Sequence, residues 1–276
     1  MASLWNLLLT QPLLNSLIGL YKLTGNLGWS IVVLTILLRF LMTPLVLPSL
    51  KVTKKIQELA PELAKLKAQF KDDKQKLMVA QAELYKKNGA NPASGCLPQI
   101  VQLLVLIALF SVFNSILKAD GSLVEKINPN LYSFNQLSAD FKLNPNFLYM
   151  DLTKPDVFHV PGLPIPLPGL FLLLSALTQL ISSKMMAPEI SAEKKIAEKT
   201  KDTTDDAMVE MQQQMGYMFP LMTLVIGFQF PAGLVVYWTI FSIVSSYQQY
   251  SVSGWGGLKP WLIKLNLLKS HSHGSH

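Results

Sequence analysis

The residue with the most distinctive chemistry in this sequence is Arg39, the only arginine among 24 basic residues. It lies near the middle of an almost uninterrupted apolar run, residues 27–47, and Thr35 and Thr43 share its helical face one turn away on either side. An arginine at the centre of a membrane-length segment costs about 2.5–3.5 kcal/mol, so it is expected to face a bundle interior or a watery cavity. These residues predict a positively charged polar site that suits an acidic ligand.

Polar side chains also recur at helical spacing within other apolar runs. They are Ser175, Gln179, Ser182 and Ser183 in one run, Trp238, Ser242, Ser245 and Gln249 in another, and Gln99 and Gln102 in a third. Serine and threonine often do no more than join helices, at about 0.6 kcal/mol per bond, and that interpretation stays open for the hydroxyls. Arg39 and Gln179 are long polar groups that need partners or water, and no carboxylate lies inside any apolar run. We therefore expect a polar cavity that is open to the cytoplasm and closed outside.

Composition predicts an all-α polytopic membrane protein. The 276-residue chain is 50% hydrophobic and only 15% charged, against about 25% charged in typical soluble domains. Cys96 is the single cysteine, so the chain cannot form an internal disulfide, and no Cys/His spacing indicates a metal site. The histidines at the C-terminus could bind metal weakly or form a frayed tail. We expect no catalytic residue, no cofactor and no enzymatic activity.

The apolar runs predict five membrane spans in a core at residues 27–250. The spans are residues 27–47, 97–117, 169–187, 215–228 and 234–250; they are joined by a hairpin at 51–91, an extracytoplasmic loop at 119–168 and a connector at 188–214, and followed by a tail at 251–276. Span 1 is expected to end at Pro44 and Pro48. Residues 1–26 predict an amphipathic helix in the membrane interface, with a cleaved signal peptide as the alternative. Its apolar face carries Leu13, Leu14, Leu17, Ile18 and Tyr21, while Gln11, Asn15 and Lys22 point elsewhere.

Residues 51–91 hold ten lysines and helix-forming residues throughout, with breaks expected at Pro61 and at residues 71–74. Their apolar spacing predicts two amphipathic helices folded into a hairpin outside the membrane. Cytoplasmic loops carry an excess of lysine, and the hairpin, the connector and the tail are the lysine-rich segments. The chain is therefore expected to run N-outside and C-inside.

Several short motifs resemble those of the YidC/Oxa1/Alb3 family of membrane protein insertases. The matching motifs are residues 28–30 with Arg39, the lysine-rich hairpin, residues 85–87, 91–92 and 95–98 with Gln102, residues 147–152, and residues 230–234 with 237–238. The resemblance covers about residues 20–250 and fits the short bacterial form, because the large extracytoplasmic domain of many members is absent. The sequence departs from many other members in having no early cysteine and so no lipoprotein-type signal.

The resemblance implies a chaperone-like insertase in the bacterial cell (inner or plasma) membrane that works without nucleotide hydrolysis. In that family a hydrophilic groove, open to the cytoplasm and to lipid, carries the arginine that Arg39 matches. The groove residues expected here are Arg39, Thr35, Thr43, Gln102, Gln179, Ser175, Trp238 and Ser242. The implied partners are nascent membrane proteins and membrane lipids. The ribosome and a Sec translocon stay open as further partners, and the short tail argues against ribosome docking.

Two other functions remain open at this point. A lone cation in a cavity would also suit an anion transporter or channel, although no internal repeat of the kind common in transporters is visible. Ser182 and Ser183 beside Lys184 could form the Ser-Lys dyad of an intramembrane hydrolase, but helix-end polar residues are the simpler interpretation.

Overall fold

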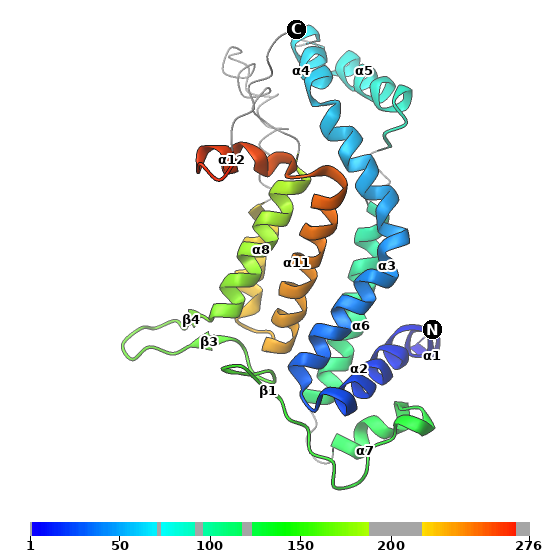
Figure 1. The fold of residues 1–276 in the computed structure, drawn as a ribbon, viewed down its shortest axis with the longest axis vertical. Coiled ribbons are helices and arrows are strands. Elements are labelled where there is room, and N and C mark those ends of the chain that lie inside the picture. Colours follow the sequence, from blue (N-terminus) through cyan, green and yellow to red (C-terminus); the bar gives the residue numbers. More distant parts are fainter. Residues whose placement is uncertain (1, 71–72, 92–95, 118–122, 188–216, 269–276) are drawn as a thin grey trace. The chain divides into compact units, whose positions relative to one another are not determined.

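The computed structural model describes residues 2–70, 73–91, 96–117, 123–187 and 217–268 (Figure 1). Helix predominates in these residues, as the sequence predicts. The helices are α1 (Ala2–Trp5), π-helix η1 (Asn6–Thr10), α2 (Gln11–Thr24), α3 (Leu27–Glu58), α4 (Ala60–Gln69), α5 (Lys74–Lys87), α6 (Cys96–Leu117), α7 (Leu123–Ile127), 3-10 helices η3 (Asn128–Asn130) and η4 (Ser133–Asn135), α8 (Leu170–Met186), Tyr217–Gly227, α11 (Ala232–Ser253), 3-10 helix η5 (Gly256–Leu258) and α12 (Lys259–Lys264). The strands are β1 (Asn146–Phe147), β2 (Met150–Asp151), β3 (Val157–Phe158) and β4 (Leu167–Pro168). The connector at 188–214, the start of span 4 and residues 269–276 lie outside the described residues.

Among the described residues, α3 alone is both long enough and apolar enough to cross a membrane, with a mean hydropathy of 2.3 in its most apolar window. Shorter apolar helices occupy Ile100–Ile116, Leu170–Met186 and Tyr217–Gly227. The helical ranges enclose or overlap the predicted spans, whereas the number of crossings and their orientation stay predictions.

The chain divides into two compact units. The first comprises Met1–Thr43, Pro98–Leu177 and Leu221–Val244, and the second comprises Pro44–Leu97, Thr178–Pro220 and Ser245–His276. The first unit holds the main hydrophobic core, to which α2, α3, α6, α11 and the 123–152 segment contribute. In this core Leu17, Ile18, Leu27 and Ala108 are completely buried.

The predicted apolar face of α2 is confirmed. All five of its members are buried, and Pro12 lies in the first turn of α2, where its missing amide hydrogen costs least. The turn before Pro12 widens into π-helix η1. The prediction that Asn15 points elsewhere is wrong, because Asn15 is also buried and bonds the segment after α7. Its amide donates to the Asn130 carbonyl at 3.0 Å and its oxygen accepts from the Tyr132 amide at 2.8 Å.

The sequence predicts that the first span ends at Pro44 and Pro48, and this prediction is wrong. Helix α3 continues through both prolines to Glu58. A proline inside a helix removes one backbone hydrogen bond, and long membrane helices tolerate it when neighbouring groups compensate. The apolar run of α3 thus continues, without an intervening loop, into the lysine-containing part of the same helix at residues 51–58.

The second unit contains the predicted helical hairpin. Helix α4 begins with Pro61 in its first turn, and α5 begins after Asp73, whose side chain accepts from the Lys76 amide at 3.0 Å. A small apolar cluster holds the two helices to the end of α3. Its members are Ile56, Leu59, Leu63, Leu84, Tyr85 and Ala90. Residues 60–69 and 74–87 are thus helical, as the sequence predicts, and apolar residues of both helices share one cluster, whereas the position of this hairpin outside the membrane stays a prediction.

Two antiparallel two-stranded sheets lie in the loop between α6 and α8. Strand β1 pairs with β2, with Phe147 opposite Met150, and β3 pairs with β4, with Phe158 opposite Leu167. The proline-rich stretch inside the second hairpin contains no helix, as predicted.

Within the first unit, this loop also holds the beginning of α3. Asn26 donates to the Asn146 carbonyl at 2.7 Å and the Leu27 amide donates to the Asn144 carbonyl at 3.3 Å. Within the second unit, the chain after α11 meets the end of α8, where the Gly257 amide donates to the Ala187 carbonyl at 3.0 Å.

Candidate functional site

Arg39 lies on α3 in the first unit and is only 7% exposed. Its guanidinium carbon is 4.6 Å from the centre of the Phe241 ring on α11, a cation–π distance. Its Nε has no hydrogen-bond partner, and no carboxylate pairs with Arg39 in the part of the chain that the structure describes. The charge is therefore held by an aromatic face rather than by an opposite charge.

Two residues that the sequence did not single out for the site complete this contact. Tyr237, one turn before Phe241 on α11, is 2% exposed, and the two rings lie 6.0 Å apart. The Gln102 side chain on α6 donates a hydrogen bond to the Tyr237 hydroxyl. The i, i+4 spacing of Tyr237 and Phe241 was a visible signal, but such spacing is more typical of ordinary core packing.

The predicted neighbours of Arg39 on its own helix bond back to their helix. The Thr35 hydroxyl donates to the Ile31 carbonyl at 2.7 Å, and the Thr43 hydroxyl donates to the Arg39 carbonyl at 3.0 Å. Each hydroxyl has used its only hydrogen this way but keeps lone pairs that can accept a further hydrogen bond.

The other predicted groove residues belong to different units of the chain. Ser175 on α8 and Ser242 on α11 are buried polar residues of the first unit. Trp238 is half-buried, and its ring packs edge-on against Phe230 at 5.9 Å, within an aromatic group that also contains Phe110. Gln179 is half-buried in the second unit. The contacts described above thus connect Arg39 on α3 to Gln102 on α6, through Phe241 and Tyr237.

The residues proposed for a Ser-Lys dyad have different contacts. The Ser182 hydroxyl lies 2.5 Å from the Ser246 hydroxyl, and the Lys184 ammonium lies 4.2 Å from the centre of the Tyr217 ring. A second ring, that of Trp261, lies 5.1 Å from the same ammonium. The described contacts thus place Lys184 against aromatic rings and Ser182 against a serine, which is not the geometry of an activated nucleophile.

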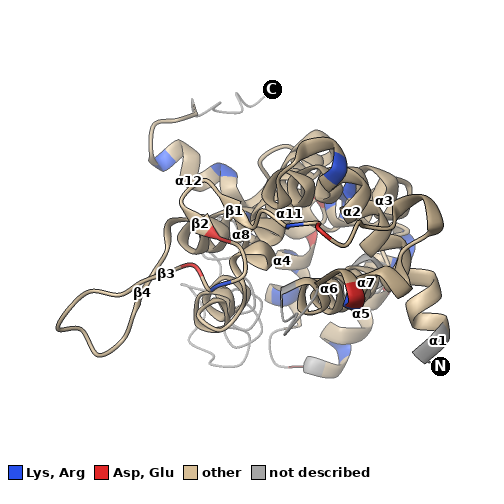
Figure 2. Ribbon diagram, turned by 90° about the horizontal axis from the view of Figure 1, so that it is seen from below, with Lys and Arg blue, Asp and Glu red and all other residues tan. Residues whose placement is uncertain are grey.

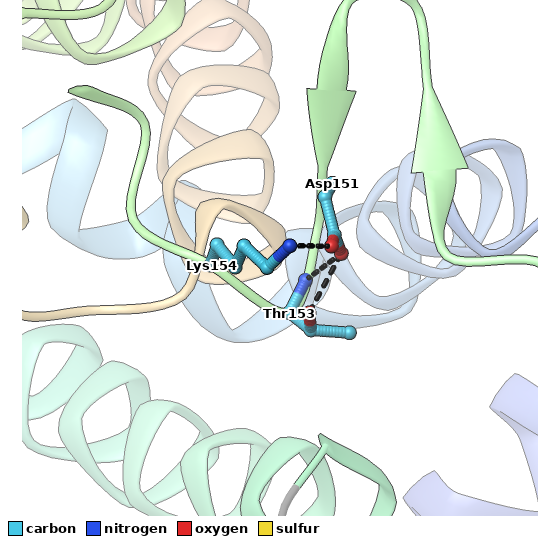
Figure 3. Close-up of polar contacts among 3 residues, drawn as sticks. All are labelled: Asp151, Thr153 and Lys154. Atoms are coloured by element: carbon cyan, nitrogen blue, oxygen red, sulfur yellow. Dashed lines mark hydrogen bonds and ion pairs between the residues drawn. The ribbon is translucent and has the colours of Figure 1, made fainter. Parts of the chain in front are cut away.

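The beginning of α11, which carries Tyr237 and Phe241, is fixed by the turn after β2. The Ala232 amide donates to the Lys154 carbonyl at 2.8 Å and the Gly233 amide donates to the Leu152 carbonyl at 3.2 Å. Asp151 holds this turn by accepting from the Thr153 hydroxyl at 2.6 Å and by pairing with the Lys154 ammonium at 3.1 Å (Figure 3).

Two opposing effects act on the carboxyl group of Asp151. Partial burial raises its pKa, but the hydrogen bonds from Thr153 and the nearby Lys154 ammonium outweigh burial and hold the pKa below its ordinary value. The loop carboxylate is therefore charged at neutral pH and keeps the turn closed.

The beginning of α8 is fixed by a second carboxylate of the same loop. Asp156 is 4% exposed, and its two oxygens accept from the Leu172 amide at 2.8 Å and from the Tyr149 hydroxyl at 2.9 Å. The Tyr149 hydroxyl in turn accepts from the Phe171 amide at 3.0 Å. Burial and the adjacent Asp156 carboxylate raise the pKa of Tyr149 to about 12, so the hydroxyl stays protonated and donates to Asp156. One loop thus caps the first turns of both α8 and α11.

The sequence itself decides the family. The profile of the family described as 60Kd inner membrane protein matches residues 19–256. The chain belongs to that family. Most of the described residues are uncharged (tan in Figure 2), and a low share of charged residues suits a member of the 60Kd inner membrane protein family.

Curated relatives carry the name "Membrane protein insertase YidC". One from Fusobacterium nucleatum is 34% identical over 232 residues, which cover 84% of this chain and 88% of the relative. One from Pelagibacter ubique is 36% identical over 88% of this chain and 38% of the relative, and one from Pelobacter propionicus is 31% identical over 90% and 39%. This member of the 60Kd inner membrane protein family therefore spans most of the first relative and under two fifths of the other two.

Proposed function

We propose that the chain is a multi-pass membrane protein insertase. It would insert and help fold membrane proteins whose short tails cross the membrane, through a cytoplasm-open hydrophilic groove that carries Arg39. The family and the printed names of the relatives support the activity. The comparisons lend no support to an anion transporter.

The observation that carries the groove is the burial of Arg39 without a carboxylate among the described residues. A buried structural charge is normally paired, because transfer of an isolated ion from water is costly. The side chains of α3 that lie next to Arg39 in the sequence are apolar and exposed: Leu37 is 54% exposed, Phe40 59% and Leu41 76%. A helix with its charge inside and its apolar face outside suits a lipid surround and a polar interior.

The ends of the helices support the proposed orientation. In the first unit, one loop contacts the first turns of α3, α8 and α11. In the second unit, Gln57 near the end of α3 donates to the Met185 carbonyl at 2.9 Å, and the chain after α11 bonds Ala187. These three helices therefore begin together and end together, as the first, third and fifth spans of a five-span protein must. Lysine bias then puts their ends in the cytoplasm.

The mechanism follows from electrostatics and lipid partition. An acidic tail of the substrate enters the wet groove from the cytoplasm and is attracted to Arg39, because opposite charges near a protein surface attract one another more strongly than they do in bulk water. The tail then has to cross only the outer apolar layer. The substrate's own apolar segment drives this step as it enters lipid, at about 0.8 kcal/mol per buried CH₂ group.

The proposed groove residues are those of the sequence prediction, extended by Tyr237 and Phe241. Gln102 and Tyr237 would orient polar groups near the charge, and Phe241 would hold the guanidinium while no substrate is bound. Thr35, Thr43, Ser175, Gln179, Trp238 and Ser242 would line the rest of the groove. The hairpin α4–α5 would recruit nascent chains, with the ribosome and a Sec translocon as further candidate partners.

The test replaces Arg39 in the full-length protein in proteoliposomes. Arg39→Ala and Arg39→Glu should lower insertion of a single-span substrate with an acidic tail, and Arg39→Glu should lower it more because it repels the tail. A substrate whose tail carries no charge should be affected less. Lys142→Gln, which removes a positive charge from an exposed side chain of the loop, is the matched control. Undiminished insertion by both Arg39 variants, in protein that remains folded, would refute the assigned role.

A further inference from the structure

The segment after α11 forms a basic, apolar surface at the end of α8. It comprises η5, α12 and the turn to Leu268, all within the second unit. Trp261 is 46% exposed, Leu265 65% and Leu267 67%, beside the exposed ammonium groups of Lys259 and Lys264. The segment was predicted only as a cytoplasmic tail, and the insertase mechanism makes no use of it.

This segment is fixed to the end of helix α8 by two close backbone contacts. The Gly257 amide bonds the Ala187 carbonyl, and Gly256 approaches the Met185 carbonyl so closely that a Cβ atom would not fit. Gly256 also has a positive φ of 48°, which glycine adopts readily. The segment is therefore attached where an apolar helix ends, rather than extending freely.

The C-terminal end of the short helix α12 leaves its apolar side chains exposed on the surface of the protein. Asn266 takes a left-handed conformation with φ of 56°, and the Leu267 amide bonds back to the Leu262 carbonyl at 2.9 Å. Trp261 and Leu265 lie one turn apart on the same face. The Lys184 ammonium, 5.1 Å from the centre of the Trp261 ring, helps hold the indole in place.

Charge indicates what covers this surface. Residues 211–276 contain three lysines, Lys259, Lys264 and Lys269, and no aspartate or glutamate. No acidic side chain in this part of the sequence therefore offsets these positive charges. Tryptophan and lysine beside exposed leucine are the residues that favour the boundary between lipid headgroups and acyl chains.

We propose that residues 256–268 bind the anionic headgroup layer of the membrane, with Trp261, Leu265 and Leu267 entering the acyl boundary and Lys259 and Lys264 contacting lipid phosphates. The three apolar side chains are a small area for a protein partner, whose interfaces typically bury about 800 Å² per side. They suffice for lipid because the adjoining helices already hold the segment at the membrane, so even a weak contact stays occupied. The inference rests on the chain being membrane-embedded, not on its inserting other proteins.

The test measures the depth of the segment in reconstituted vesicles of full-length protein. In a Cys96→Ser background, a nitroxide is attached at Leu265→Cys or, as a water-exposed control on α5, at Gln75→Cys. Collision with apolar oxygen and with a water-soluble nickel chelate is compared in phosphatidylcholine vesicles with and without phosphatidylglycerol. We expect position 265 to be oxygen-accessible and protected from nickel, and this protection to increase with phosphatidylglycerol. Position 75 should show neither effect.

Removal of charge then tests the headgroup contact. The double variant Lys259→Gln/Lys264→Gln should lose the dependence on phosphatidylglycerol, because each lysine near an anionic surface contributes about fivefold to partitioning. Lys86→Gln/Lys87→Gln removes the same charge from exposed positions of α5 and should leave the label at 265 unchanged.

Three outcomes would overturn the proposal: equal nickel access at 265 and 75, a depth indifferent to both headgroup charge and the lysine variant, or protection that arises only when ribosomes are added. Insertion of a substrate is measured separately in the same vesicles. A deep label in protein that inserts nothing would refute the proposed function and leave this inference standing.

Discussion

The contact between Arg39 and Phe241 allows a quantitative test of how the buried charge is stabilised. The guanidinium carbon lies 4.6 Å from the ring centre and Arg39 is 7% exposed. Desolvated cation–π contacts contribute about 2 kcal/mol, and exposed ones about 0.5–1 kcal/mol. We therefore expect a coupling free energy of about 1–2 kcal/mol in a double-mutant cycle built from Arg39→Met and Phe241→Leu.

The cycle is measured on purified protein in mixed micelles, with unfolding by sodium dodecyl sulfate followed through tryptophan fluorescence. The loss of ring volume in Phe241→Leu cancels in the cycle, so the coupling reports the interaction itself. Phe241→Tyr keeps an aromatic face and should retain most of the coupling. Effects of the two substitutions that add to within about 0.3 kcal/mol would refute the reasoning, because additivity of that quality indicates independent sites.

Three further predictions concern the loop that holds the helices. Asp156→Ala leaves the buried Leu172 amide without its acceptor and should lower the free energy of unfolding by about 1–3 kcal/mol, whereas Asp156→Asn keeps an acceptor oxygen and should lose less. Gly28→Ala places a Cβ atom against the Phe147 ring and should lower the thermal midpoint, with partial recovery in Gly28→Ala/Phe147→Leu. The pKa of Asp151 is lowered in the folded protein, so its stabilisation is present above its ordinary pKa of about 3.9 and is lost as pH falls through the lowered value. Asp151→Asn should therefore flatten the acid end of the stability profile measured by thermal unfolding.

Other results would contradict these expectations. Equal losses in Asp156→Ala and Asp156→Asn would show that the accepted hydrogen bond is not what Asp156 contributes. A Gly28→Ala variant as stable as the parent would show that Phe147 turns aside without cost. An acid profile unchanged by Asp151→Asn would place the acid-sensitive groups elsewhere.

Periodicity predicted the helices well, because burial of an apolar face depends on local spacing. The face of α2 was identified from spacing alone, and all five of its members are buried as expected. The end of α3 was predicted wrongly because proline was taken as a stop. In a long apolar helix the cost of one missing hydrogen bond does not outweigh continued packing.

The long-range contacts of the site could not be predicted in the same way. Asn15 was expected to point away from the apolar face, yet it bonds residues more than a hundred positions later in the sequence. Tyr237 and Phe241 have the spacing of core residues, and only their position beside Gln102 and Arg39 distinguishes them. Spacing does not reveal the role of loop carboxylates such as Asp156 either, because nothing local in the sequence shows which helix they cap.

The uninterrupted helix α3 has a mechanical consequence. The division of the chain into two units falls between Thr43 and Pro44, one turn after Arg39, and Pro44 and Pro48 leave the carbonyls of Phe40 and Pro44 without their usual amide donors. Bending is least costly where helical hydrogen bonds are missing. From Pro44 to Glu58 the helix extends about 21 Å, so a 20° bend at Pro44 would displace its far end by about 7 Å. Bending of α3 is therefore expected to concentrate at Pro44 and Pro48, directly after the turn that carries the buried guanidinium.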